Sequence, residues 1–203
     1  MLVPFSSLPD HARVWIYPAS RPFSASEKEE ISGMLSQFLN QWATHGTPLK
    51  TAYDLPYDRF IVIGLDEEVQ GASGCSIDAS VHLIQQLEVK LDVVLLDKMN
   101  VCYREKEQIL YTPLKEFRKL AKSPKVNLDT IVFNNLVVDK AEYESIWEVL
   151  FYKSSYFFFF RLSFLNHSVF IYSVLIICFL ALNNIKSFFT FNYCRYFFRI
   201  ETK

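Results

Sequence analysis

Short apolar segments joined by turns of a few residues are the feature that most constrains the fold of this chain. Only three residues separate NVCYR (100–104) from QILYT (108–112), and only three separate LKTAYDL (49–55) from RFIVIGL (59–65). Connections this short can join antiparallel strands, whereas parallel strands need a crossover of a dozen or more residues. The sequence therefore predicts antiparallel strand pairing.

Helix signals stand between these strands. Ser26 and Glu29 have the spacing of a capping box, and the segment after them predicts a helix over 27–44 that stops at Gly46. Its apolar residues recur at helical spacing: Ile31, Met34, Leu35, Phe38, Leu39 and Trp42. Further helices are predicted over 76–90, from Pro113 to Pro124, and after Asp139, which with Glu142 forms a second capping pattern.

Three more segments are rich in strand-forming residues, namely 13–17 (RVWIY), 93–96 (VVLL) and 130–138 (TIVFNNLVV). Runs of strands with helices between them indicate an α+β domain, with helices on one face of a mostly antiparallel sheet. We expect this domain to occupy residues 1–150, followed by an aromatic-rich apolar tail over 151–203.

The charge of the chain is unevenly distributed. Residues 1–150 carry 15 Lys or Arg and 21 Asp or Glu, a net charge of −6, and the tail carries 6 basic residues and one acid, a net charge of +5. An acidic body lacks the basic face that neutralises phosphates, so we expect no nucleic-acid partner.

The cysteines and the N-terminus indicate a cytoplasmic protein. The four cysteines are Cys75, Cys102, Cys178 and Cys194, and no pair has CxxC spacing, so we expect no metal site and no disulfide scaffold. The N-terminal residues lack a basic region followed by an apolar run, and we therefore expect no cleaved signal peptide.

Small and reactive residues are densest in GASGCSIDAS (71–80). Ser73 or Ser76 can cap the predicted helix, and free N–H groups at Ser73, Gly74, Cys75 and Ser76 would attract an anion. The same helix start could lower the thiol pKa of Cys75 and make it a nucleophile. Asp78 and His82 lie four residues apart on one helical face, where they could act as an acid–base pair.

The alternative is an ordinary junction between a loop and a helix, with Cys75 as a small packed side chain. Three interpretations of this segment therefore stay open: a structural junction, an anion or small-ligand site, and a cysteine nucleophile. His45, expected at the C-terminal end of the first helix, fits a helix cap.

Several nucleotide and hydrolase motifs are absent from the sequence. It contains no GxxxxGK[ST], GxGxxG, HExxH or GxSxG pattern. ATP is therefore not an expected cofactor, and no motif of the sequence identifies another cofactor.

Five segments together carry a resemblance to a known family. The chain resembles the small uncharacterised proteins of Bacteroidetes-type bacteria that commonly carry the label "ABC transporter ATPase", over about Leu8 to Val149. The matching segments, in chain order, are RVWIY (13–17), YDRFIVIGL (57–65), ASGCSIDAS (72–80), LLDKMNV (95–101) and TIVFNNLV (130–137). The label implies an ATPase, but the family supplies no established active-site residues, and this chain lacks the Walker A and LSGGQ-type signature motifs.

The tail has two principal interpretations. Residues 162–182 carry no formal charge and are long enough to span a bilayer, which predicts a single-pass membrane anchor. However, residues 151–203 hold 13 of the 19 phenylalanines and only four residues whose codons begin with G: Val169, Val174, Ala181 and Glu201. Translated A/T-rich DNA has this composition, so a frameshift or read-through product is the other interpretation, with a buried core element as a third.

These observations favour a cytoplasmic binding or interaction domain with a protein or small-molecule partner. The alternatives are an enzyme or anion- or nucleotide-binding module built at Gly74–Cys75–Ser76, and a protein anchored in a membrane through residues 162–182.

Overall fold

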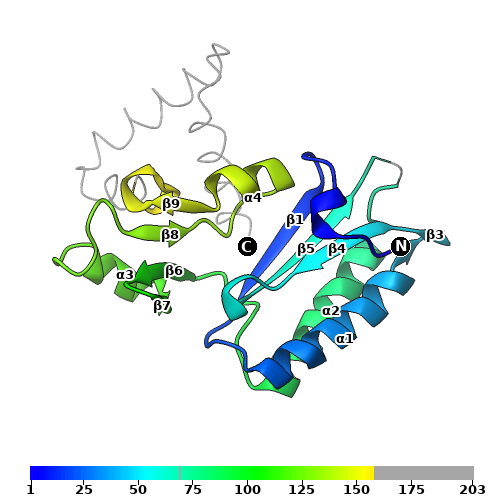
Figure 1. Cartoon of the computed structure of the whole chain (residues 1–203), viewed down its shortest axis with the longest axis horizontal. Coiled ribbons are helices and arrows are strands. Elements are labelled where there is room, and N and C mark those ends of the chain that lie inside the picture. The colour runs from blue at the N-terminus through cyan, green and yellow to red at the C-terminus, as the bar shows by residue number, and fades with distance from the viewer. Residues whose placement is uncertain (69, 158–203) are drawn as a thin grey trace, which may run out of the picture.

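The computed structural model describes residues 1–68 and 70–157, and these form an α+β fold with antiparallel sheets, as the sequence predicts (Figure 1). The first sheet has the strand order β1-β5-β4, made of β1 (Arg13–Pro18), β5 (Phe60–Asp66) and β4 (Lys50–Asp54). The second has the order β7-β6-β8-β9, made of β7 (Gln108–Pro113), β6 (Asn100–Glu105), β8 (Ile131–Phe133) and β9 (Glu148–Leu150). A small hairpin joins β2 (Ala43–Thr44) and β3 (Thr47–Pro48).

The helices α1 (Ala25–Gln41), α2 (Gly74–Leu91), α3 (Leu114–Leu120) and α4 (Lys140–Ile146) accompany these sheets, and residues 155–157 are also helical. Helices α1 and α2 lie side by side on one face of the first sheet (Figure 1). Helix α3 packs against the second sheet. Three short 3₁₀ helices complete the described part: η1 (Phe5–Ser7), η2 (Pro56–Asp58) and η3 (Phe151–Lys153).

Strand β5 is buried along its whole length because both of its faces are covered. Ile61, Ile63 and Leu65 belong to the core cluster that contains α1 and α2. Phe60 and Val62 point the other way, since side chains alternate along a strand, and they pack in a cluster that includes side chains of the second sheet. This burial on both faces explains why 59–65 is an almost continuous apolar run.

A separate core lies under α3. Phe117 of α3 is fully buried with Val101 and Val132 of the second sheet, and Phe151 and Tyr156 complete this cluster. The packing of the chain therefore continues past β9 as far as the described residues extend.

The first helix begins earlier than its sequence pattern predicts. Ser24, not Ser26, is the N-cap: its hydroxyl accepts the Glu27 N–H group, and the Glu27 carboxylate accepts the Ser24 N–H group at 2.7 Å. Arg21 fixes this choice, because its guanidinium donates to both carboxylate oxygens of Glu27 at 2.7 and 3.0 Å.

The same helix ends at Gln41, and His45 is not at its C-terminus. His45 and Gly46 have φ angles of 49° and 81°, and they reverse the chain between β2 and β3. Left-handed backbone at two consecutive residues is typical of a tight hairpin turn. Gly46 therefore lies in the turn of a hairpin and does not end the helix.

Two strand predictions also need correction. Residues 93–96 form no strand, and the strand predicted over 130–138 stops at Phe133. The chain turns after Phe133, where the Asn134 N–H group donates to the Trp147 carbonyl and the Val137 N–H group donates to the Asn134 carbonyl. Strand β9 was not predicted, and it pairs with β8.

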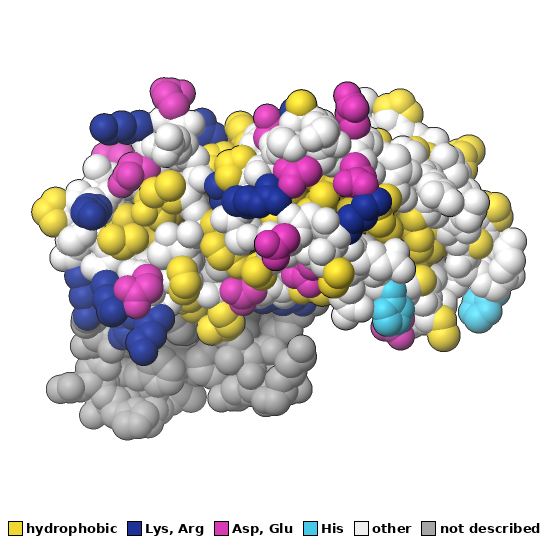
Figure 2. All heavy atoms as spheres, turned by 90° about the horizontal axis from the view of Figure 1, so that it is seen from below, with side chains coloured by type: hydrophobic (Ala, Val, Ile, Leu, Met, Phe, Trp, Pro, Cys, Tyr) yellow, Lys and Arg dark blue, Asp and Glu magenta, His cyan; other side chains and the backbone are white. Residues whose placement is uncertain are grey.

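Among the described residues, no helix has the length and apolar character needed to cross a membrane. The predicted span 162–182 lies outside the described residues. On the face of the molecule shown in Figure 2, acidic and basic side chains are interspersed, with hydrophobic side chains between them.

Candidate functional site

Helix α2 begins at Gly74, two residues before its predicted start, and Ser73, one of the two predicted cap residues, is its N-cap. The Ser73 hydroxyl accepts the Ser76 N–H group, and the Ser76 hydroxyl donates to the Ser73 carbonyl at 2.9 Å. Trp42 covers this turn, since its Nε1–H group donates to the Ser76 carbonyl at 2.8 Å. Much of the hydrogen-bonding capacity of this turn is therefore used inside the protein.

The three candidate reactive side chains on α2 are all exposed, but no hydrogen bond joins them. Cys75 is exposed at the first turn. His82 pairs through Nδ1 with Gln85 Oε1 at 2.9 Å rather than with Asp78. Within the described residues, neither a hydrogen bond nor an ion pair connects Cys75, Asp78 and His82, so the structure does not assemble a nucleophile with a base at this place.

A cluster of aromatic rings lies where the two sheets meet, and we call it the seam cluster. Trp147 is at its centre, with ring centroids at 5.0 Å from Phe60, 5.1 Å from Phe133 and 4.8 Å from Tyr143. Tyr57 closes the cluster on the surface, 6.0 Å from the Trp147 ring and 5.8 Å from the Phe133 ring. The rings come from η2, β5, β8 and α4 with its C-cap, so only the tertiary fold brings them together.

Tyr57 is presented by an unusual backbone. Its φ and ψ angles are 57° and 22°, and the next residue, Asp58, has a φ of 51°. Left-handed backbone is an outlier for a bulky aromatic residue and costs about 1–2 kcal/mol per residue. The side chain of Tyr57 nevertheless stays 48% exposed. Residues held in such sparsely populated backbone conformations cluster at functional sites.

Two charged residues of the second sheet fix the Tyr57 ring. The Tyr57 hydroxyl donates to Glu148 Oε1, and Arg104 donates to Glu148 Oε2 at 2.9 Å. The Arg104 guanidinium carbon lies 5.1 Å from the Tyr57 ring centroid, which is a cation–π distance. Burial, together with the hydrogen bond to Glu148, raises the pKa of Tyr57 and keeps its hydroxyl protonated.

Three carboxylates act on Tyr143 in this cluster. Burial raises the pKa of Tyr143 well above its ordinary value, and the carboxylates of Asp54, Glu148 and Glu144 raise it further. Asp54 is exposed, and its carboxylate accepts only the adjacent Leu55 N–H group among the described residues. The seam cluster therefore combines aromatic faces with carboxylates, which is the chemistry that recognises a cationic group.

A second cluster, at the end of β5, could hold a metal ion. His11, Asp66 and Glu68 each place one ligand atom within 4.8 Å of the others. Burial would raise the pKa of Asp66, but hydrogen bonds from Lys50 and from the Glu68 N–H group, with the charge of Lys50, lower it below its ordinary value. Asp66 is thus held as a carboxylate.

Neither of these two clusters was predicted from the sequence. Their members lie in segments far apart along the chain, and none belongs to a motif of fixed spacing. The PYD turn before β5 was visible in the sequence, but nothing in it indicates that Tyr57 faces Arg104 and Glu148.

Comparison of the chain with protein-family models, with curated proteins and with solved structures finds no match. The functional argument therefore depends on the geometry described above.

Proposed function

We propose that this protein is an interaction domain that binds a basic segment of a partner protein at the seam cluster. The observation that carries the proposal is the half-exposed Tyr57 ring, held in left-handed backbone and hydrogen-bonded to Glu148. The carboxylates of Asp54 and Glu144 act on Tyr143 of the same cluster. Tyr, Trp and Arg are the residues most enriched among those that dominate binding energy at protein interfaces.

Charge supports a cationic partner. Glu148 and Glu144 each pair with a basic residue, Arg104 and Lys140, at 2.9 Å. Asp54 has no ion pair among the described residues, so its negative charge is available to attract a cation. The acidic balance of residues 1–150 favours the encounter of this domain with a basic partner at low salt.

The seam also has the anatomy of an interface. Tyr57 is its exposed aromatic residue, supported from below by the buried Phe133 and Trp147 rings, and ion pairs lie near it, among them Lys28 with Asp58 at 2.7 Å. Arg104 already occupies a cation–π position on Tyr57, so a guanidinium from a partner would use the exposed part of that ring and the carboxylate of Asp54. An arginine-bearing segment is therefore the proposed ligand.

The test uses the full chain and a fluorescent oligo-arginine peptide, with an oligo-glutamate peptide of equal length as the charge control. We expect saturable binding of the arginine peptide alone, weakened by added salt. Tyr57→Ala should weaken it about tenfold, since a central aromatic residue contributes more than 1 kcal/mol at an interface.

The matched control is Tyr152→Ala, which removes another exposed tyrosine that also lies beside a cation, Lys153. This control should bind like the unchanged chain. Equal affinity for Tyr57→Ala and Tyr152→Ala would exclude the seam as the binding surface.

The role proposed here makes no use of ATP. The resemblance to proteins labelled ABC transporter ATPase and the cytoplasmic location stay predictions, as do the alternatives of a site at Gly74–Cys75–Ser76 and an anchor at 162–182.

A further inference from the structure

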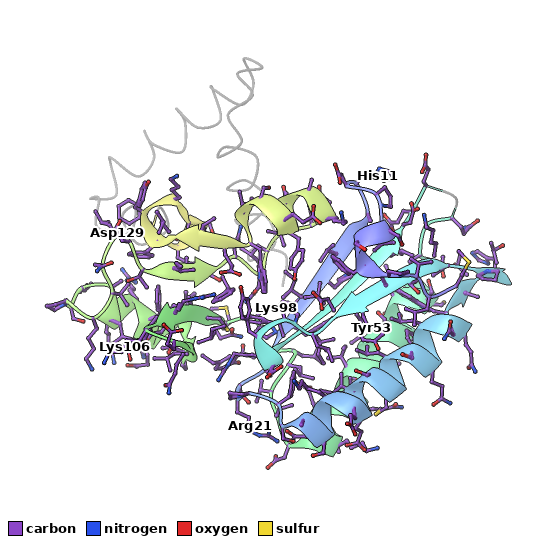
Figure 3. The ribbon with its side chains drawn as sticks, viewed as in Figure 1. His11, Arg21, Tyr53, Lys98, Lys106 and Asp129 are labelled. Atoms are coloured by element: carbon purple, nitrogen blue, oxygen red, sulfur yellow. The ribbon has the colours of Figure 1, made fainter. Side chains whose placement is uncertain are left out.

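Three side chains with different metal-ligand atoms converge where β5 ends. His11 comes from the loop before β1, Asp66 is the last residue of β5, and Glu68 follows two residues later. His11 Nε2 lies 3.7 Å from Asp66 Oδ1 and 3.9 Å from Glu68 Oε2. Figure 3 shows His11 at the end of the first sheet, where the chain enters β1.

These separations are close to those of ligands around one metal ion. Ligand atoms at about 2.1 Å from a tetrahedral Zn²⁺ ion lie about 3.4 Å from each other. The side chains of His11 and Glu68 are 59% and 72% exposed, so both can turn to bring the three ligand atoms, which lie within 4.8 Å of one another, closer together.

Asp66 provides a fixed point for such a site. Its side chain is only 3% exposed, and Lys50 Nζ holds Oδ2 at 2.9 Å. The Glu68 N–H group donates to Oδ1 at 3.1 Å, and the same oxygen faces His11. A ligand carboxylate oriented by its own hydrogen-bond partners is a recurrent feature of protein metal sites, and here Lys50 has that orienting role.

We propose that His11, Asp66 and Glu68 bind one divalent transition-metal ion, with Zn²⁺ as the reference case. An imidazole nitrogen favours such ions over Mg²⁺ and Ca²⁺, which prefer all-oxygen ligands. Two carboxylates attract the ion, although Lys50 offsets part of the charge of Asp66, and the exposed side of the cluster leaves the remaining coordination positions to water. The ion ties the loop before β1 to the segment that follows β5.

The site is tested by equilibrium dialysis of the full chain, stripped of metal, against Zn²⁺ and separately against Mg²⁺, with bound metal measured by elemental analysis. We expect one saturable Zn²⁺ ion per chain that is displaced by a chelator, and no comparable Mg²⁺ binding. His11→Ala and Glu68→Gln should each weaken Zn²⁺ binding about tenfold or more, because each removes one of only three protein ligands.

Two matched controls are built into the chain. Glu67→Gln removes the neighbouring acid, which pairs with Arg13 at 3.4 Å, and His82→Ala removes another exposed histidine. Both should leave Zn²⁺ binding unchanged. A further variant, Cys75→Ser, removes the exposed thiol and should also have no effect.

The proposal is overturned if the chain takes up no saturable Zn²⁺, or if uptake survives both His11→Ala and Glu68→Gln. Loss of uptake in Cys75→Ser with retention in His11→Ala would place the ion on the thiol and would equally exclude this site. Circular dichroism of each variant shows whether it is folded. A variant that is folded but takes up no Zn²⁺ has lost the site and not the structure.

Discussion

The carboxylate of Glu88 accepts the backbone N–H group of Leu95 at 2.6 Å, and the same oxygen accepts the N–H group of Leu96 at 2.8 Å. Glu88 lies near the end of α2, so the helix fixes the segment that leaves it. The Val94 N–H group is likewise accepted by the Ser20 hydroxyl at 3.1 Å. In a strand, the N–H groups of residues 94–96 would bond to a neighbouring strand. Here they bond to side chains, which explains why 93–96 is not a strand.

Glu88→Ala should lower the free energy of unfolding by about 1.5–3 kcal/mol, because hydrogen bonds to a charged acceptor are stronger than neutral ones. Urea unfolding followed by circular dichroism measures the change. Glu29→Ala, which removes an exposed acid from α1, is the control and should change stability by less than about 0.5 kcal/mol. Equal effects of the two substitutions would contradict the anchoring role of Glu88.

Glu27 gives the fold a dependence on acidic pH. The hydrogen bond from Arg21, together with the Ser24 N–H group, lowers the pKa of Glu27 from 4.5 to about 2. The folded state therefore favours the carboxylate, and the contribution of Glu27 is full above the unfolded pKa and is lost as pH falls toward 2.

Glu27→Gln should accordingly be less stable than the unchanged chain at neutral pH, with a difference that shrinks between pH 4.5 and about 2. Thermal unfolding at a series of pH values measures this difference. Glu29→Gln tests the alternative cap predicted from the sequence, and a larger effect at Glu29 than at Glu27 would show that the alternative is right.

Gly64 is required by close packing in β5. A Cβ atom there would lie 2.4 Å from Leu8 Cδ1 and 3.2 Å from Phe5 Cε2, and Leu8 is only 3% exposed. Gly64→Ala should therefore lower the free energy of unfolding by about 1–3 kcal/mol through overpacking.

Gly33 on α1 offers a control of opposite sign. Nothing lies within 4 Å of a Cβ atom at that position. Gly33→Ala should raise stability by about 0.5–1 kcal/mol, because alanine restricts the unfolded chain more and suits a helix better. Urea unfolding of the two variants in parallel tests both, and destabilisation by Gly33→Ala would contradict the open space around Gly33.

The two cysteines of the described residues should differ strongly in reactivity. Burial raises the pKa of Cys102 to about 12, although the charge of Arg59 and a hydrogen bond with Asn135 act in the opposite direction. Because the thiolate is the reactive form, we expect iodoacetamide to modify Cys75 in the native protein and Cys102 only after unfolding. Peptide mass spectrometry distinguishes the sites, and native modification of Cys102 would refute its burial.

Sequence patterns were sufficient where the chain interacts with itself locally. The hairpin of β6 and β7 followed from a short turn between two strand-like segments, and the Asp139 cap of α4 followed from its spacing to Glu142. In each of these cases the deciding hydrogen bonds join residues that are close along the chain.

Local patterns failed where a distant partner selects between two options. Ser24 and Ser26 both suit an N-cap. Arg21, which binds Glu27 of the observed capping box, is itself held by the distant Leu91 carbonyl, to which it donates at 2.5 Å. Strand β9 forms by pairing with the edge of β8. Its three residues alone carry too little signal to predict a strand.

The sequence by itself determined the α+β class, the antiparallel pairing and most helix positions, because periodicity, caps and turn lengths are local properties. Only the tertiary structure divided the strands between two sheets, and only it placed Tyr57 against Arg104 and Glu148 and His11 against Asp66. Both clusters depend on contacts between segments far apart in the chain, and such contacts are fixed by the packing of the whole domain rather than by any short stretch of residues.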